Sequence, residues 1–143
     1  MELVWKRCLA AEMPATYAAT IHDLDPVRQA ELYTVDGVLD QVWGVSSGRD
    51  QIAAAYGERF SEWEDSNHWV TNIRVTTCSD EAAVVKSFVL GLFTFTAEHH
   101  RDPLLYRGEY VFELTWSTER WEISRLTITR HGVAGLPLIA TSF

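Results

Sequence analysis

The residues of this chain best suited to proton chemistry are Tyr17, His68 and Asn72. An imidazole has an ordinary pKa of about 6.5, so His68 can take or give a proton near neutral pH. A phenol with an ordinary pKa of about 10 can donate a hydrogen bond to an oxygen on which negative charge develops. Asn72 lies on the predicted face of His68, where its amide can orient a carbonyl or hold one imidazole tautomer. Together they predict a small acid/base site.

Each of these residues also has a structural interpretation. His68 can be a partly buried histidine held by a backbone partner. Tyr17 can be a core residue whose hydroxyl finds a backbone acceptor, and the amide of Asn72 can make a purely structural hydrogen bond. The residue types alone leave both interpretations open.

Other polar residues are weaker candidates. His22 follows Tyr17 by five residues, about 140° around an ideal helix, so we expect it at the mouth of the pocket or at the surface, as an auxiliary residue. His99 and His100, with Asp102, resemble a metal cluster, but neighbouring side chains in an extended segment diverge and a fourth ligand at suitable spacing is lacking. No glycine-rich phosphate loop, Ser-His-Asp order or Cys-x-x-Cys pair occurs in the sequence. We therefore expect no metal and no cofactor.

Helical periodicity marks the first third of the chain. Apolar residues recur at helical spacing from Met13 to Leu24, and Pro14 predicts that this helix starts there, with residues 2–12 as a separate arm. The pair Asp25-Pro26 is typical of an N-cap followed by proline at the first helical position, which predicts a short second helix.

A strand and a third helix are expected next. Residues 38–45 fit one strand that follows a turn at Asp36-Gly37 and ends at Gly44. Apolar residues from Ile52 to Trp63 then recur at intervals of four, four and three, which predicts an amphipathic helix.

From residue 67 onward the period changes to two. Residues 67–77, 82–96, 104–116 and 121–131 are rich in Val, Ile, Thr and aromatic residues, and short polar segments separate them. They predict an antiparallel meander. Three helices covering one face of a strongly bent sheet make an α+β domain that can enclose a cavity. The apolar residues on both faces of the first long strand predict a homodimer through the outer sheet face.

Composition narrows the class of protein. The chain has 143 residues, 47% of them hydrophobic, which suits a single domain over residues 1–143 with its core at about 10–131. The formal net charge of -8 disfavours nucleic acid and anionic membrane surfaces as partners. Two cysteines seventy positions apart and the lack of a leader pattern favour a cytoplasmic protein. The apolar tail, residues 132–143, is expected to cover the pocket or a partner subunit.

Several short motifs, in their order and spacing, resemble the SnoaL-like polyketide cyclase and dehydratase group of the nuclear transport factor 2-like superfamily. The resemblance implies a cone-shaped α+β barrel in which three N-terminal helices and a strongly bent, mostly antiparallel sheet enclose a hydrophobic pocket. The motifs are Tyr17-Ala18-Ala19 leading to Asp25, Leu32-Tyr33 with Asp36, the segment from Asn67 to Asn72, Gly108-Glu109-Tyr110 and Trp121-Glu122-Ile123.

The resemblance also bears on the site. His68 and Tyr17 match residues that dehydratase relatives use, whereas His22 stands where those relatives often carry an aspartate. Gln41 stands where steroid-isomerase relatives place a proton-shuttling aspartate, and an amide cannot shuttle a proton by ionising. Gln41 and a set of aromatic side chains are expected to bind substrate. The aromatic residues are Trp43, Tyr56, Phe60, Trp63 and Phe88.

The leading hypothesis is a cofactor-independent acid/base enzyme, a cyclase, dehydratase or isomerase, acting on a hydrophobic, ring-containing polyketide-like or terpenoid molecule. In it His68 moves the proton, and Tyr17 and Asn72 stabilise the oxyanion. The alternatives are a non-catalytic small-molecule-binding protein and a dimeric scaffold whose pocket is filled by its own side chains. A cavity well below about 300 Å³ would favour the scaffold.

Overall fold

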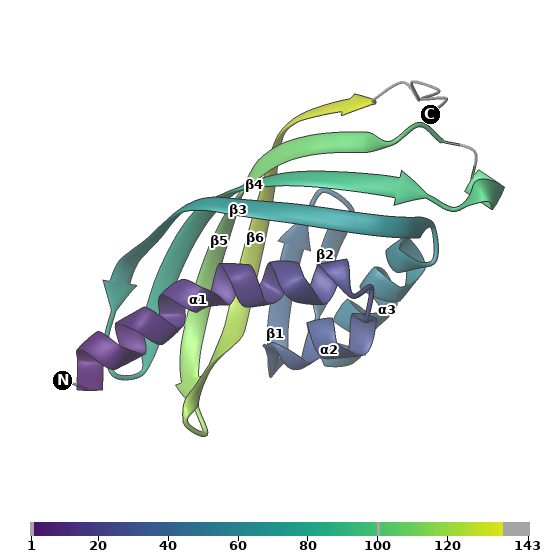
Figure 1. The fold of residues 1–143 in the computed structure, drawn as a ribbon. Helices are drawn as coiled ribbons and strands as arrows, with labels where there is room; N and C mark the ends of the chain where they lie inside the picture. The colour runs from purple at the N-terminus through teal and green to yellow at the C-terminus, as the bar shows by residue number, and fades with distance from the viewer. Residues whose placement is uncertain (1, 100, 136–143) are drawn as a thin grey trace.

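Three helices lie on one side of a six-stranded sheet in the computed structural model, which describes residues 2–99 and 101–135 (Figure 1). The sheet has the strand order β2-β1-β6-β5-β4-β3, and only β1 and β6 among the neighbouring strands run parallel. The predicted α+β class with an antiparallel meander is confirmed. The helices are α1 (Glu2–His22), α2 (Pro26–Glu31) and α3 (Arg49–Phe60). The strands are β1 (Tyr33–Gln41), β2 (Gly44–Ser47), β3 (Trp63–Cys78), β4 (Ala82–Phe95), β5 (Leu104–Ser117) and β6 (Arg120–Gly135), with a short 3₁₀ turn η1 (Ala97–His99) after β4.

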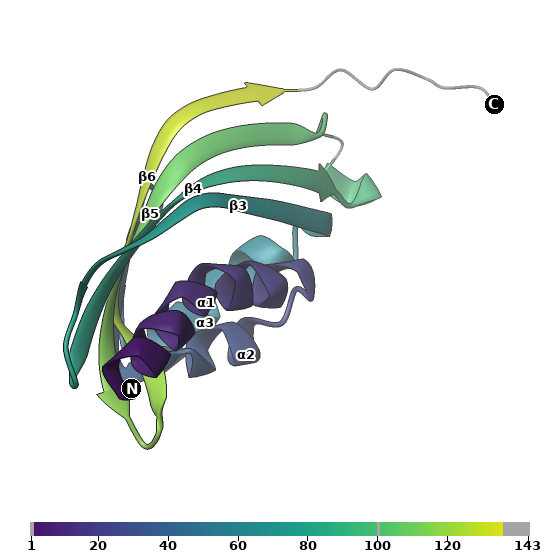
Figure 2. The same cartoon turned by 60° about the vertical axis from the view of Figure 1, so that its left-hand side comes forward.

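The long strands bend over the helices and leave the sheet open (Figure 2). Alternation along the strands directs one set of side chains toward the helices, as Val85, Val89 and Phe93 show in β4, where all three are buried. Gly91 lies on the same inner face, where a Cβ atom would come within 2.1 Å of the Tyr106 ring. The absent side chain at Gly91 therefore lets this ring pack flat against β4.

Helix α1 is longer than the sequence predicts, because it runs through Pro14 without ending. Its first half is fixed by contacts with β3, the β3–β4 turn and β6. The Lys6 ammonium group donates to the carbonyl oxygen of Asp80 at 2.9 Å, and the Trp121 indole donates to the carbonyl oxygen of Lys6 at 2.8 Å. Arg7 donates to the carbonyl oxygen of Val75 at 2.7 Å. These tertiary contacts stabilise the segment that the proline pattern assigned to a separate arm.

The predicted N-cap of α2 is confirmed. The carboxylate of Asp25 accepts hydrogen bonds from the backbone N–H groups of Val27 at 3.1 Å and Arg28 at 3.0 Å, and Pro26 occupies the first helical position. This tight cap turns the chain from α1 into α2 and brings Tyr33 to the start of β1.

The region after α2 differs from the prediction of one strand at 38–45. The chain forms an antiparallel hairpin of β1 and β2, and β1 continues through Asp36-Gly37 where a turn was expected. A Cβ atom on Gly37 would lie 2.8 Å from the carbonyl oxygen of Ile123, so glycine permits the close approach of β1 to β6. Trp63, expected at the end of the third helix, opens β3, because α3 ends at Phe60.

The C-terminal tail was expected to cover the pocket or a partner subunit. Residues 132–135 extend β6, and residues 136–143 of the predicted covering tail lie outside the described residues. Within the described chain, no helix combines the length and the apolar character that crossing a bilayer requires.

Candidate functional site

A cavity of about 200 Å³ lies between the helices and the inner face of the bent sheet. Side chains from α1, α3, the β1–β2 hairpin and β3 to β6 line it, so the site depends on segments from the whole chain. The lining residues are Tyr17, Ile21, Gln41, Trp43, Tyr56, Arg59, Glu62, Trp63, His68, Phe93, Phe95, Arg101, Leu104, Tyr106, Tyr110, Ile128 and Arg130.

His68 lies in the cavity wall on β3, partly buried, with its ring edge-on to two aromatic rings. The ring centroids of His68 and Phe93 are 5.2 Å apart, and those of His68 and Tyr106 are 5.8 Å apart. Desolvation among these rings lowers the pKa of His68 to about 4, because burial penalises the charged imidazolium. His68 is therefore neutral at physiological pH.

The hydrogen-bond partner of His68 is a hydroxyl group. Its Nδ1 lies 3.2 Å from Oγ of Ser66, which is completely buried two residues earlier on β3. Ser66 faces inward because β3 alternates, so it shares a face with His68. A neutral hydroxyl fixes the ring orientation without adding the negative charge that would stabilise an imidazolium.

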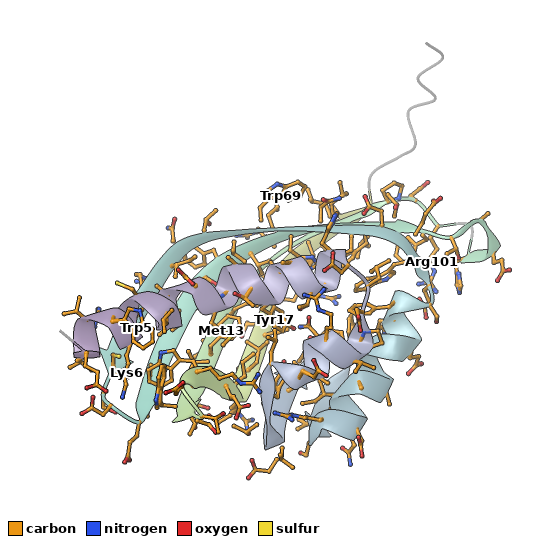
Figure 3. All side chains as sticks on the ribbon, turned by 60° about the horizontal axis from the view of Figure 1, so that its bottom comes forward. Trp5, Lys6, Met13, Tyr17, Trp69 and Arg101 are labelled. Atoms are coloured by element: carbon orange, nitrogen blue, oxygen red, sulfur yellow. The ribbon has the colours of Figure 1, made fainter. Side chains whose placement is uncertain are left out.

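All five tyrosines of the chain are buried, and four of them line the cavity. The hydroxyls of Tyr17 and Tyr56 are hydrogen-bonded to each other, and those of Tyr106 and Tyr110 lie 2.9 Å apart. Burial is the largest cause that raises the pKa of Tyr17, and the neighbouring phenols raise this pKa further. Burial also raises the pKa of Tyr106 to about 12. The phenols consequently stay protonated and supply O–H donors rather than bases. Figure 3 shows Tyr17 on α1 between the helices and the sheet.

Most of the sequence-predicted binding residues lie where they were expected. Gln41, Trp43, Tyr56 and Trp63 line the cavity, whereas Phe60 packs behind it, 5.2 Å from the ring centroid of Tyr56. The structure thus brings His68 and Tyr17 to the same cavity as these residues.

Phe88 and Asn72 do not line the cavity, contrary to the prediction. Phe88 is 42% exposed on the outer sheet face, because the inner face of β4 belongs to the alternate set that includes Ser87 and Val89. Asn72 is exposed and has a positive φ of 54° at a register shift between Thr71 and Arg74. This bulge breaks the strict alternation on which the placement of Asn72 beside His68 depended.

His22 lies at the surface, as its helical angle from Tyr17 predicts, and its side chain is 58% exposed. Its Nδ1 is 2.9 Å from the carbonyl oxygen of Ser66 and 4.0 Å from a carboxylate oxygen of Asp65. His22 and His68 both border a second, more open hollow of about 320 Å³ that small residues of α1 line, outside the aromatic cavity. The two histidines are therefore tied to the same short segment of β3 through different atoms of Ser66.

The charged mouth of the cavity was not predicted from the sequence. Arg59 and Arg101 each lie beside the Glu62 carboxylate, at 3.6 and 3.8 Å, and Arg130 completes the charged lining. Arg59 follows Tyr56 by nearly one helical turn, the only sequence signal that points it toward the cavity. Arg101 lies in an irregular segment whose direction no periodicity indicates.

Among residues 2–99 and 101–135, no group of three or more His, Cys, Asp or Glu side chains is placed to hold a metal ion.

Three helices under a strongly bent, open sheet, with an aromatic cavity between them, define the cone-like α+β fold of the nuclear transport factor 2-like superfamily. The family profile of the SnoaL-like domain matches residues 11–127, and the chain belongs to this family. No curated protein matches the chain.

Solved structures of similar fold come from several proteins. One from Novosphingobium aromaticivorans, provisionally described as an aromatic ring hydroxylase, has a TM-score of 0.84 at 20% identity over 93% of this chain and 94% of its own. Another from the same organism, provisionally described as a scytalone dehydratase, has a TM-score of 0.85 at 18% identity over 94% and 90%. A hexachlorocyclohexane dehydrochlorinase from Novosphingobium barchaimii has a TM-score of 0.83 at 18% identity over 96% and 94%. At these identities the likeness concerns the fold alone.

Proposed function

We propose that the protein is a cofactor-independent acid/base enzyme of the dehydratase, cyclase or isomerase type, acting on a hydrophobic, ring-containing small molecule of polyketide-like or terpenoid kind. One observation carries the proposal: a neutral imidazole and a protonated phenol, His68 and Tyr17, line the same aromatic cavity. Similarity in fold to proteins described as a dehydratase and a dehydrochlorinase supports the reaction class.

In the proposed mechanism His68 removes a proton next to a carbonyl or leaving group. The contact with Ser66 engages Nδ1, so Nε2 is the nitrogen that acts on the ligand. Tyr17, supported by Tyr56, donates a hydrogen bond to the oxygen that becomes negatively charged. Exclusion of water by the aromatic walls strengthens both interactions. Asn72 has no part in this mechanism, because it lies outside the cavity, and His22 acts only through the Ser66 segment.

A base-catalysed elimination on a flat ring tests the proposal without knowledge of the natural substrate. A nitro-substituted benzisoxazole, which opens when a positioned base removes its ring proton, is a suitable probe. We expect His68→Ala to lower the enzyme-dependent rate by about 10²–10⁴-fold, the usual contribution of a general base. His131→Gln, which alters an exposed histidine on β6, is the matched control and should leave the rate unchanged. A folded His68→Ala variant as active as the parent would refute the assignment.

A non-catalytic protein is the second candidate, and the small cavity supports either the dimeric scaffold or a binding protein for small ligands. At about 200 Å³ the cavity is smaller than the roughly 300 Å³ at which pockets for drug-sized ligands begin. It suits a ligand of one or two rings. A pure binding protein would show altered ligand affinity in His68→Ala and Tyr17→Phe with no enzyme-dependent reaction in either variant or the parent.

We further propose a homodimer through the outer sheet face. Trp69, Phe88 and Leu90 are 50%, 42% and 40% exposed on β3 and β4, where Trp69 pairs with Leu90 and Phe88 pairs with Thr71. Figure 3 shows Trp69 on the side of the sheet away from the helices. Arg107 and Glu109 of β5 pair with Leu90 and Phe88 in the ladder, so the patch has one positive and one negative neighbour. This arrangement is complementary to a second copy of itself under two-fold symmetry.

Sedimentation of the wild type and of Phe88→Glu tests the dimer. We expect the wild type to sediment as a dimer and Phe88→Glu as a monomer, because the carboxylate would be desolvated in the interface. Val35→Glu, at an exposed valine on β1, is the control and should remain dimeric. A wild type that is monomeric at high concentration would contradict the proposal.

A further inference from the structure

The mouth of the cavity contains a small ion-pair cluster that the proposed acid/base chemistry does not use. The carboxylate of Glu62, whose side chain is 20% exposed, lies 3.6 Å from Nη1 of Arg59 and 3.8 Å from Nη1 of Arg101. The guanidinium groups also lie over aromatic rings, at 4.8 Å from the Trp43 centroid for Arg59 and 5.6 Å from the Phe95 centroid for Arg101.

Different elements supply these groups. Arg59 is in the last turn of α3, Glu62 follows that helix directly, and Arg101 precedes β5. The backbone holds Glu62 in place, because its N–H donates to the carbonyl oxygen of Arg59 and its own carbonyl oxygen accepts from Thr96, both at 3.1 Å. Figure 3 shows Arg101 at the end of the molecule beyond α3. The carboxylate is thus fixed on the backbone, while the arginines reach it with long side chains.

The charge at the mouth is opposite in sign to that of the whole protein. Within the part of the chain that the structure describes, the cavity lining contains Arg59, Arg101 and Arg130 but only one acidic residue, Glu62. The lining therefore has a net charge of +2 on a protein of net charge -8. A pocket that took only neutral apolar molecules would gain nothing from this local excess of positive charge, whereas an anion would gain both steering and pairing.

We infer that the cavity takes an amphiphilic organic anion, with its ring among the aromatic side chains and its carboxylate or equivalent oxyanion at the mouth, where it competes with Glu62 for Arg59 and Arg101. This inference names the substrate class of the proposed function and rests on the same cavity. Arg130 adds a third positive charge to the cavity lining. Glu62 acts as an internal competitor that keeps the two guanidinium groups gathered in the absence of ligand.

Removal of a positive charge and removal of the negative charge at the mouth should have opposite effects on the affinity for an anion. An ion pair at a partly exposed site contributes about 0.5–1 kcal/mol, equivalent to roughly a two- to five-fold change in affinity. Arg59→Gln and Arg101→Gln should each weaken binding of an anion by about this factor. Glu62→Gln should strengthen it by a similar factor, because the competing carboxylate is replaced by a neutral amide of similar shape.

The experiment compares two probes of nearly identical shape, naphthalene carboxylate and the neutral naphthalene carboxamide, by isothermal titration calorimetry at low and high salt. The wild type should bind the carboxylate more tightly than the carboxamide, and added salt should reduce this preference. Both arginine variants should lose affinity for the carboxylate only, and Glu62→Gln should gain it. Arg28→Gln, in an exposed arginine of α2 paired with Asp23 at 3.1 Å, is the matched control and should behave as the wild type.

The outcomes separate this inference from the proposed function. Tighter or equal binding of the carboxamide, failure of the wild type to bind either probe, or weaker carboxylate binding by Glu62→Gln would each overturn the anion site. A wild type that prefers the carboxylate but does not accelerate the elimination, or whose elimination rate is unchanged in a folded His68→Ala variant, would instead overturn the acid/base function and leave the anion site standing.

Discussion

Replacement of His68 by glutamine should change how the stability of the protein depends on pH. Burial lowers the pKa of His68 in the folded protein to about 4, whereas an unfolded chain has the ordinary value near 6.5. As the pH falls below 6.5, the unfolded state therefore binds a proton that the folded state does not, and stability is lost until the pH reaches about 4. Glutamine at this position does not titrate, so the variant lacks this part of the acid sensitivity.

The size of the effect follows from the two pKa values. Between pH 7 and pH 5, a group that titrates near 6.5 unfolded and near 4 folded reduces the free energy of unfolding by about 2 kcal/mol. His68 keeps part of its surface in water, and this solvent screening lowers the expected value to roughly 1–2 kcal/mol.

Urea unfolding of the wild type and of His68→Gln at pH 7, 6 and 5 provides the measurement. The difference between the two proteins should shift by roughly 1–2 kcal/mol over this range in favour of the variant at low pH. All other titrating groups contribute equally to both proteins and cancel. Parallel pH profiles for the wild type and His68→Gln would refute the reasoning that the ring of His68 is desolvated.

Three further predictions concern the interior of the protein and helix α3. Tyr17→Phe and Tyr56→Phe should each lower the free energy of unfolding by about 1–2 kcal/mol, since each leaves a buried hydroxyl without its partner, and the double variant should lose less than the sum. Gly91→Ala should cost about 1–3 kcal/mol, because its Cβ would lie 2.1 Å from the Tyr106 ring. Gly57→Ala has room inside α3 and should instead stabilise by about 0.5–1 kcal/mol. Urea unfolding measures all three effects. Additive tyrosine effects, a neutral Gly91→Ala or a destabilising Gly57→Ala would each contradict the corresponding prediction.

Local patterns in the sequence predicted those features that depend on neighbouring residues. The cap at Asp25-Pro26 needs only the next turn of chain, and the four long strands follow from side chains that alternate between two faces. His68 and Tyr17 could be assigned to the cavity because both lie within regular elements.

Features that depend on distant contacts could not be predicted in this way. Alternation fails at Asn72, where a bulge turns the residue outward. The proline rule fails at Pro14, because hydrogen bonds with β3, the β3–β4 turn and β6 hold the first half of the helix in place. Phe88 shows a related limit, since a strand pattern defines two faces without indicating which one is buried.

The sequence by itself determined the α+β class, the aromatic character of the interior and the residues able to move a proton, because composition and periodicity are properties of the chain alone. Only the tertiary structure decided that Ser66 is the partner of His68 and that Arg59 and Arg101 meet at Glu62. The physical reason is that the charged mouth joins the end of a helix to a segment about forty residues away, and no short-range pattern specifies that contact.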